Sequence, residues 1–335
     1  APSIGTGKQR MTNLIRVGLI GAACLTLGAA SARAENWDMP TPYADGIFHT
    51  QNIAEFAADV GEATGGNVTI TVHSANSLFG HAEIRDAVRD GLVPIGEFLL
   101  SRLANEDPIF ALDSIPFLAS SYEESEALWA ASREAVSAKL AEQGLTLLYA
   151  VPWPGQSLYL KQEITDPAQL QGLNFRAYNV ATERLATLVG ATPTQVEETD
   201  VATAFSTGRV EAMITSPSTG ANAKAWDFVS NFIDVQAWLP KNVVVVNTDM
   251  FDALSQEDRD AILAAAAAAE TRGWDLSRAE NDQKIAELEA GGMVVSQPSE
   301  ALAAKLQEVG ATMTAEWEQQ AGDEGRAVVE AYRNR

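Results

Sequence analysis

The feature that most constrains the fold is a regular alternation of short apolar runs with longer amphipathic stretches. Residues 68–73 alternate apolar and polar side chains, as half-buried strands do, and residues 243–247 carry an apolar run typical of a strand buried on both faces. Residues 48–64 place apolar side chains on one helical face and end at a glycine pair, while residues 255–290 carry an unusually long helical pattern. Strands that alternate with helices in this way predict an α/β protein.

The first 34 residues have the features of an export signal. A weakly basic segment after Met11 precedes a short apolar run, and Ala32 with Ala34 forms the A-x-A pattern read by signal peptidase. We expect a leader over 1–34, with the signal over 11–34 and residues 1–10 arising from a vector or an over-long start. The alternative, an N-terminal anchor helix, is disfavoured because a membrane span needs about 20 apolar residues.

The remaining chain of about 300 residues exceeds the usual size of a single hydrophobic core, which predicts two lobes. No low-complexity linker separates two halves of the sequence. We therefore expect lobes joined by strands that cross between them rather than by a flexible tether.

The net charge limits which partners the chain can bind, and the cysteine content limits which disulfides and metal sites it can form. A formal net charge of −22 argues against nucleic acid or an anionic membrane as a partner and gives no reason to expect stable membrane insertion. The single cysteine, Cys24, lies in the predicted signal, so the exported part would contain no disulfide and no thiolate metal site. Cys24 as a lipoprotein cysteine is the rival interpretation, which Gly21 disfavours because that signal prefers a larger apolar residue there.

Arg176 is the strongest candidate for a functional residue. It lies in a predicted strand among apolar and aromatic neighbours, where a guanidinium offers a planar fork that fits a carboxylate. Two structural alternatives stay open at this point: an exposed strand arginine, or an arginine paired with Glu197 or Glu198.

From Asp166 to Gly220 the chain resembles the substrate-binding component of TRAP (tripartite ATP-independent periplasmic) transporters. The order and spacing of the shared positions carry this resemblance: Asp166, Leu170, Gly172, Arg176, Gly190, Ala191, Pro193, Ala204, Thr207, Gly208, Val210 and Thr215. It extends upstream through 77–80 and 113–118, and downstream through 238–242 and the long helix. The resemblance implies a two-lobed periplasmic-binding-protein-like fold, with lobe 1 mainly over 35–152, lobe 2 mainly over 153–245, and a long helix and C-terminal segment over 246–335 that return across both lobes.

The same resemblance implies a ligand-binding set centred on Arg176 as the residue that binds a carboxylate. The other members would line the cleft between the lobes: His49, Glu97, Trp153, Tyr178, Asn179, Thr215, Ser216, Trp238 and Asn242, with Ser218 as a further lining candidate. Sialic-acid binders of the family carry a second arginine where this chain has Ser157, which disfavours a bulky sugar acid of that kind. For Trp153 and Trp238 the alternative is plain core packing, for Glu97 a surface strand end, and for residues 215–220 a simple turn.

The sequence contains few features that indicate catalysis. The three histidines, His49, His73 and His81, form no metal-binding pair at helical spacing, and we expect neither a metal nor a cofactor. The favoured function is capture of a small organic carboxylate in the periplasm by a monomer that delivers it to TRAP membrane subunits. A sugar acid, an aromatic or oxo acid, and a dicarboxylate stay open as ligands. The alternatives are an exported α/β hydrolase using Glu97 and Glu198, and a binding protein of an ATP-driven importer.

Overall fold

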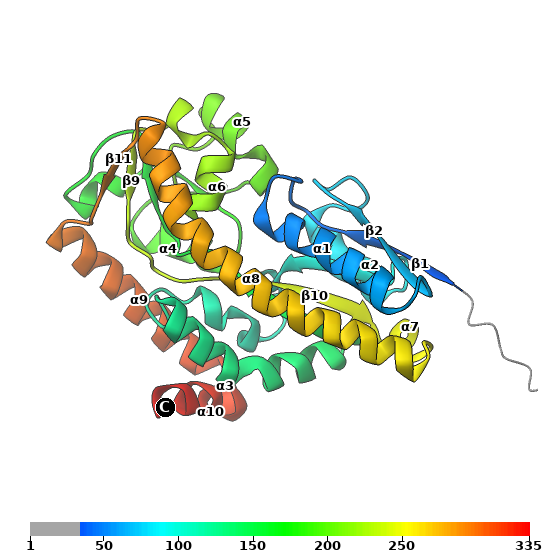
Figure 1. The fold of residues 1–335 in the computed structure, drawn as a ribbon. Coiled ribbons are helices and arrows are strands. Elements are labelled where there is room, and N and C mark those ends of the chain that lie inside the picture. Colours follow the sequence, from blue (N-terminus) through cyan, green and yellow to red (C-terminus); the bar gives the residue numbers. More distant parts are fainter. Residues whose placement is uncertain (1–33) are drawn as a thin grey trace, which may run out of the picture. The chain divides into compact units, whose positions relative to one another are not determined.

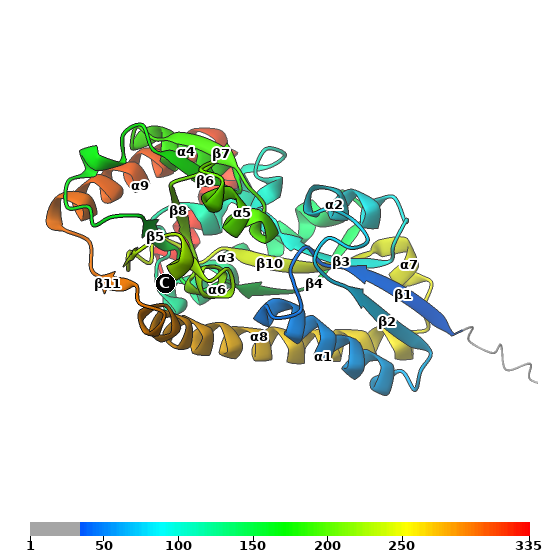
Figure 2. The same cartoon turned by 90° about the horizontal axis from the view of Figure 1, so that it is seen from above.

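A computed structural model describes residues 34–335, so all of the predicted leader except Ala34 lies outside the described residues. One group of strands forms the sheets of lobe 1 (Figures 1 and 2): β1 pairs in parallel with β2, and β10 lies between β3 and β4, antiparallel to both. The bounds are β1 Glu35–Pro40, β2 Val68–His73, β3 Ile95–Leu99, β4 Leu145–Pro152 and β10 Lys241–Asn247. All of β10 is buried, which confirms the strand predicted from its apolar run.

Four helices pack on these strands, each against a strand close to it in the fold. α1 covers β2, α2 covers β3, α3 covers β4, and the short α7 follows β10. Their bounds are α1 Phe48–Ala63, α2 His81–Arg89, α3 Tyr122–Ala141 and α7 Thr248–Asp252. The Ser121 side chain caps α3 by accepting a hydrogen bond from the Glu124 amide.

Lobe 2 is built on a six-stranded mixed sheet with the order β11-β9-β5-β8-β6-β7. Its strands are β5 Ser157–Leu160, β6 Asn174–Ala177, β7 Thr192–Gln195, β8 Ala212–Thr215, β9 Asn231–Ile233 and β11 Val294–Ser296, and its helices are α4 Val180–Leu188, α5 Val201–Ser206 and α6 Pro217–Asn222. The sequence patterns do not predict β5, β7 or β9, because strands of three or four residues are too short to show a period. The chain crosses between the two lobes after β4 and again after β9, and the predicted two-lobed α/β fold is confirmed.

A single long helix, α8 (Gln256–Ala290), runs along both lobes, as Figures 1 and 2 show. At 1.5 Å per residue it extends about 50 Å, and it contacts α1 and β4 in lobe 1 and α6 and β11 in lobe 2. Its predicted start is confirmed, since the Ser255 side chain accepts from the Asp258 amide. Gly273 permits its close approach to β4, because a Cβ there would lie 2.3 Å from a methyl group of Val151.

The C-terminal segment forms two helices after α8. α9 (Glu300–Gln320) is capped by Ser299, whose side chain accepts from the Leu302 amide. The chain then turns at Gly322, which has a φ of 66°, and α10 (Gly322–Arg333) packs against α3 and α9. A left-handed backbone conformation at Gly322 therefore separates the two helices.

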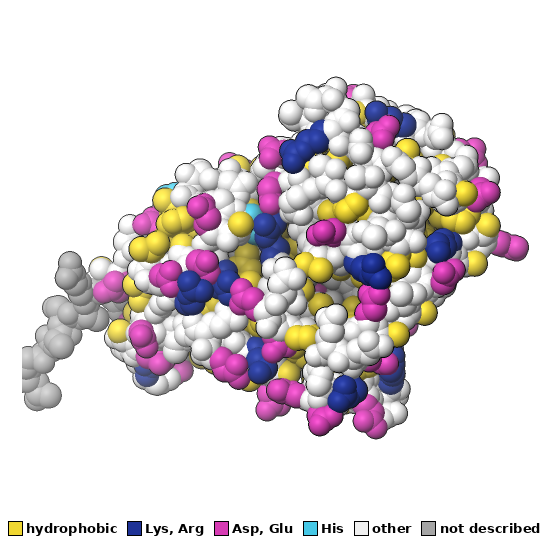
Figure 3. All heavy atoms as spheres, turned by 180° about the vertical axis from the view of Figure 1, so that it is seen from behind, with side chains coloured by type: hydrophobic (Ala, Val, Ile, Leu, Met, Phe, Trp, Pro, Cys, Tyr) yellow, Lys and Arg dark blue, Asp and Glu magenta, His cyan; other side chains and the backbone are white. Residues whose placement is uncertain are grey.

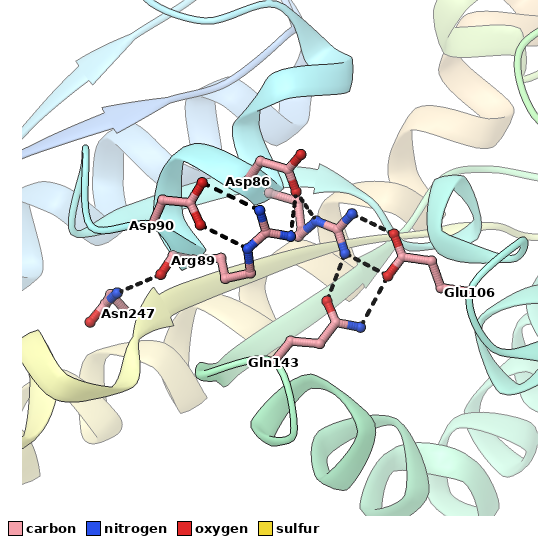
Figure 4. A network of polar contacts seen from close by, with 7 residues as sticks. Asp86, Arg89, Asp90, Glu106, Gln143 and Asn247 are labelled. Atoms are coloured by element: carbon pink, nitrogen blue, oxygen red, sulfur yellow. Dashed lines mark hydrogen bonds and ion pairs between the residues drawn. The ribbon is translucent and has the colours of Figure 1, made fainter.

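A network of polar contacts fixes α2, whose first residue is His81 (Figure 4). Arg85 donates to Glu106 at 2.6 Å and to Gln143 at 2.7 Å, and Gln143 donates in turn to Glu106 at 3.2 Å. The far end of α2 is held by Asn247, whose amide donates to the Arg89 carbonyl at 3.2 Å. These contacts matter for the site because α2 carries His81 toward the space between the lobes.

The exterior of the described residues mixes both signs of charge. On the face drawn in Figure 3, acidic and basic side chains are interspersed and hydrophobic atoms gather in small groups. Among residues 34–335, no helix combines the length and the apolar character that crossing a bilayer would require.

Candidate functional site

A cavity lies between the two lobes, and its empty space together with the open solvent at its mouth is about 400 Å³. Lobe 1 contributes side chains from the loop before α1, from α2, and from the ends of strands: Tyr43, His81, Leu99, Arg102, Trp153 and Pro240. Lobe 2 contributes mostly polar side chains: Gln156, Arg176, Tyr178, Glu197, Glu198, Thr215, Ser216 and Thr219. Half of the predicted set therefore lines the cavity: Trp153, Arg176, Tyr178, Thr215 and Ser216.

Arg176 lies near the middle of β6 and is 3% exposed. Its Nε–H donates to the Val196 carbonyl at 3.0 Å, one Nη donates weakly to Thr215 Oγ1 at 3.4 Å, and the guanidinium lies 5.1 Å from the centre of the Tyr178 ring. A guanidinium has five N–H donors, so several remain for a ligand. Burial lowers the pKa of Arg176, which reflects the cost of holding its charge away from water.

The two structural alternatives for Arg176 are wrong. It is not exposed, and within residues 34–335 no carboxylate forms an ion pair with it. Glu197 instead pairs with Arg102 across the lobes, at 3.1 Å. The guanidinium therefore faces a cavity, and no residue of 34–335 serves as its counter-ion.

Thr215 and Ser216 continue this wall of the cavity at the end of β8. The Ser216 hydroxyl accepts from the Thr219 amide at 3.0 Å and so caps α6, which shows that residues 215–220 are not a simple turn. Gly220 lies directly over the Tyr159 ring, where a Cβ would be 2.1 Å from the hydroxyl oxygen. The wall thus packs tightly against the sheet behind it. We call Arg176, Glu198, Thr215 and Ser216 the Arg176 side of the cavity.

Glu198 stands beside Arg176 in the lining, at the start of the short 3-10 helix Glu198–Asp200. No residue in the described part of the chain donates a hydrogen bond to its carboxylate or forms an ion pair with it. Burial raises its pKa, and the positive charge of Arg176 acts in the opposite direction. The cavity lining therefore contains one buried cation, Arg176, and one half-buried anion, Glu198, and no ion pair joins the two.

Arg102, His81 and Glu197 form a cluster, here called the rim, that joins the lobes beside the cavity. The side chains of Arg102 and Glu197 are 17% and 32% exposed, so this cluster is nearer to solvent than Arg176. His81 Nδ1 lies 3.4 Å from a Glu197 oxygen, while its Nε2 accepts from the Leu99 amide at 3.1 Å. Burial lowers the pKa of His81 to about 4, and the His81 and Arg102 contacts outweigh the opposing effect of burial and hold the pKa of Glu197 at about 2.

Asn242 organises the opposite side of the cavity, although it does not itself line it. Its Oδ1 accepts from the Tyr43 hydroxyl at 3.1 Å and from the Trp153 indole at 2.9 Å, which fixes both rings in the lining. Its amide donates to Glu97 at 3.2 Å. We call Tyr43, Trp153, Asn242 and Glu97 the Asn242 side.

Glu97 lies behind this layer, in the middle of β3, and is 2% exposed. Its carboxylate accepts from Thr41 at 2.7 Å and from Asn242, and His49 Nδ1 is 3.7 Å away. Burial, partly offset by these hydrogen bonds, raises the pKa of Glu97 to about 7. The alternative of a surface strand end is wrong, and neither Glu97 nor His49 is among the lining residues.

The other predicted residues outside the lining have structural contacts. Asn179 caps α4 by accepting from the Thr182 amide at 2.8 Å, and its own amide donates to Ser101 of lobe 1 at 2.8 Å. Trp238 is fully buried, in line with the core-packing alternative, and the Ser218 hydroxyl donates to Glu280 of α8 at 2.6 Å.

Several residues of the lining were not predicted from the sequence: Tyr43, His81, Leu99, Arg102, Gln156, Thr219 and Pro240. Most of these lie on loops or at the first turn of a helix, where no local pattern marks a side chain as facing the other lobe. His81 is the first residue of α2 and follows Gly80, and Glu83 lies in the same first turn. Its place at a helix start is the local feature from which a role at the cavity could have been predicted.

Comparison with known proteins identifies relatives over nearly the whole described chain. Residues 44–320 match the DctP family model, described as bacterial extracellular solute-binding protein, family 7. The structure is similar to DctP7, a Bordetella pertussis extracytoplasmic solute receptor binding pyroglutamic acid, with 43% identity, a TM-score of 0.88, and coverage of 90% of this chain and 100% of that one.

Two further solved structures extend the comparison. A marine metagenome TRAP solute-binding protein specific for pyroglutamate is 41% identical with a TM-score of 0.89, again over 90% of this chain and 100% of the other. A TRAP periplasmic solute-binding protein from Roseobacter denitrificans with bound β-D-glucuronate shares the fold at 23% identity and a TM-score of 0.82, over 89% of this chain and 99% of that one. The family match and the relatives above 40% identity show that this chain belongs to the family 7 bacterial extracellular solute-binding proteins, the DctP family of TRAP solute receptors.

Proposed function

We propose that the chain is an exported periplasmic receptor that binds a small cyclic monocarboxylate, with pyroglutamate as the first candidate, and delivers it to the membrane subunits of a TRAP transporter. The observation that carries this proposal is the buried guanidinium of Arg176, which faces the cavity and has no counter-ion among the described residues. A carboxylate placed there would accept two N–H donors in the geometry that a planar fork favours.

The energetics of Arg176 favour an anionic ligand. A buried charge without a partner costs several kcal/mol, and an ion pair formed in a space without water recovers much of that cost. The free receptor therefore holds a charge that the ligand neutralises, so the ligand carboxylate supplies both affinity and orientation.

The size and polarity of the cavity favour a small ligand with one carboxylate. The enclosed space of the cavity is only about 40 Å³, measured for the centre of a water-sized sphere, which favours a small ligand. Ser157, at the position of the second arginine of sialic-acid binders, is fully buried, and its hydroxyl accepts from the Val235 and Gln236 amides at 3.0 and 3.1 Å. It offers no second cation for a larger or doubly charged acid, and the relatives above 40% identity that bind pyroglutamate point to a ligand of that size.

Delivery requires that the lobes separate and close. The Arg102–Glu197 ion pair and the Asn179–Ser101 hydrogen bond both join lobe 1 to lobe 2 and would form as the lobes close on a ligand. A monomer with this closure suffices for delivery, and the TRAP membrane subunits would recognise the closed form.

Binding without turnover is part of this proposal. The hydrolase alternative needs Glu97 and Glu198 to face one substrate, but Glu97 lies behind Tyr43 and Trp153, outside the lining. The family 7 match favours TRAP subunits over an ATP-driven importer.

A ligand panel tests the proposal. Purified protein is heated with pyroglutamate, glucuronate, galactonate, 2-oxoglutarate and succinate, and hits are followed by calorimetry and by chromatography of the recovered ligand. A ligand at 100 times its Kd adds about 2.7 kcal/mol of stability, which moves the melting temperature by several degrees. We expect pyroglutamate to give the largest shift and to be recovered unchanged.

Matched variants separate specific binding from general stabilisation. Arg184, on α4, pairs with Glu316 outside the cavity, so Arg184→Met should keep the pyroglutamate shift that Arg176→Met loses. A shift that survives Arg176→Met, or a panel in which no carboxylate has an effect, would contradict the proposal.

A further inference from the structure

Two adjacent glutamates at the cavity differ in their partners. Glu197 is engaged by Arg102 at 3.1 Å and by His81 at 3.4 Å. Glu198 lines the same cavity, yet within residues 34–335 no side chain or backbone amide donates to its carboxylate. Glu198 is half-buried, and its carboxylate keeps its acceptor oxygens free for a donor that a ligand can supply.

The Arg176 side therefore presents a cation and an anion to the same small space. A ligand that fits it presents a carboxylate to Arg176 and a hydrogen-bond donor to Glu198. We propose that Glu198 accepts a hydrogen bond from a ring N–H of the ligand, and so selects a lactam acid over a ligand of the same shape with an oxygen acceptor in that place. This inference rests on the proposed function and names the group that decides which cyclic acid is bound.

The same arrangement disfavours dicarboxylates. A second ligand carboxylate would share the cavity with Glu198, and the arginine that could offset the repulsion, Arg102, is already engaged by Glu197. Like charges in a poorly solvated site repel strongly. The ligand end that lies away from Arg176 is therefore neutral and donates a hydrogen bond.

A pair of ligands that differ in one ring atom tests the inference. Pyroglutamate carries a ring N–H, and its lactone analogue, 5-oxotetrahydrofuran-2-carboxylate, carries a ring oxygen that only accepts. Calorimetry at pH 7.5 measures both Kd values for the unmodified protein and for Glu198→Gln. A hydrogen bond to a charged acceptor gives roughly 10- to 100-fold preference, so we expect the unmodified protein to prefer the lactam by about that factor.

Glu198→Gln should change the ratio of the two Kd values, lactone to lactam, rather than only the affinity for pyroglutamate. A glutamine amide can donate to the ring oxygen, so Glu198→Gln should bring the preference below about 5-fold. Glu198→Ala, which removes the acceptor for both ligands, should also reduce the ratio and serves if the glutamine variant does not fold. Glu163 is exposed and is not part of the cavity lining, so Glu163→Gln provides the control and should keep the original ratio.

The possible outcomes distinguish the role of Glu198 from the proposed function itself. Tight binding of pyroglutamate with equal binding of the lactone would overturn the role of Glu198 and leave the proposed function intact. A ratio that Glu198→Gln and Glu198→Ala do not change would also overturn it. Failure of the unmodified protein to bind pyroglutamate at all would reject the proposed function and this inference together.

Discussion

The two sides of the cavity differ in how far their polar groups are already satisfied. On the Asn242 side, Tyr43 and Trp153 both donate to Asn242, which in turn donates to Glu97. On the Arg176 side, the guanidinium has one strong and one weak hydrogen bond, and Glu198 has none among the described residues. The polar groups of the Asn242 side have their partners before a ligand binds, whereas those of the Arg176 side would gain partners from the ligand.

This difference assigns two tasks of a binding site to different sides: the Asn242 side defines its shape, and the Arg176 side provides its affinity. Fully paired groups fix the rings of Tyr43 and Trp153, so that they define the shape of the cavity. The unpaired buried charge of Arg176 raises the free energy of the empty site, and a ligand carboxylate that pairs with it lowers this free energy again, which gives affinity. Changes on the two sides should therefore have different signatures in stability and in affinity.

The largest effect is expected at Arg176. Arg176→Met should weaken binding of a carboxylate by about 3–5 kcal/mol, because the ligand would lose its counter-ion in a poorly solvated site. The same change should stabilise the ligand-free protein, since the buried charge it removes has no ion-pair partner among the described residues. Calorimetry and urea unfolding measure the two effects, with Arg184→Met as the control. A destabilised free protein would show that Arg176 serves the fold, and the contrast between the two sides would fail.

A smaller effect, visible in its pH dependence, is expected on the Asn242 side. The pKa of Glu97 is about 7 in the folded protein, against an ordinary value of 4.5. The folded state therefore holds its proton more tightly, so this contribution to stability is complete below about pH 4.5 and is lost as the pH rises through 7. Relative to Glu97→Gln, the unmodified protein should lose about 2–3 kcal/mol of unfolding free energy between pH 5 and pH 8.

Urea unfolding at the two pH values checks this, and Glu163→Gln is the matched control because Glu163 is exposed. Parallel pH profiles for the unmodified protein and Glu97→Gln would mean that Glu97 stays ionised, and that the Asn242 side contains a buried charge as the Arg176 side does.

The sequence predicted the Arg176 side better than its opposite, for a physical reason. Arg176 and Thr215 lie on strands whose apolar neighbours mark them as interior, and a charged residue in such a strand is conspicuous. Tyr43 and Arg102 lie in a loop and a 3-10 helix, and only the packing of one lobe against the other turns them toward the cavity. Asn242 was predicted as a contact residue, but its role depends on pairing across β10, which local sequence does not encode.

Local sequence patterns are limited in the same way for the fold. The long helix and the buried β10 were predictable because their patterns extend over many residues. The break at Gly322 was not, because a glycine in a helical pattern is compatible both with continuing the helix and with ending it. Asn179 carries a recognisable capping pattern with Thr182, so its structural use could have been found from sequence.

The smallest effect is expected at the rim, where the two lobes meet. Arg102 and Glu197 are partly exposed, and exposed ion pairs contribute about 0.2–1 kcal/mol, so Arg102→Met should weaken ligand binding less than ten-fold, mainly through faster dissociation. A double-mutant cycle with Glu197→Gln isolates the pair, and its coupling should shrink in 1 M salt as screening weakens the interaction. Arg89, paired with Asp90 outside the cavity, provides the control. If the coupling exceeded the loss caused by Arg176→Met, closure at the rim rather than neutralisation of Arg176 would dominate affinity, and the two sides of the cavity would no longer account for recognition.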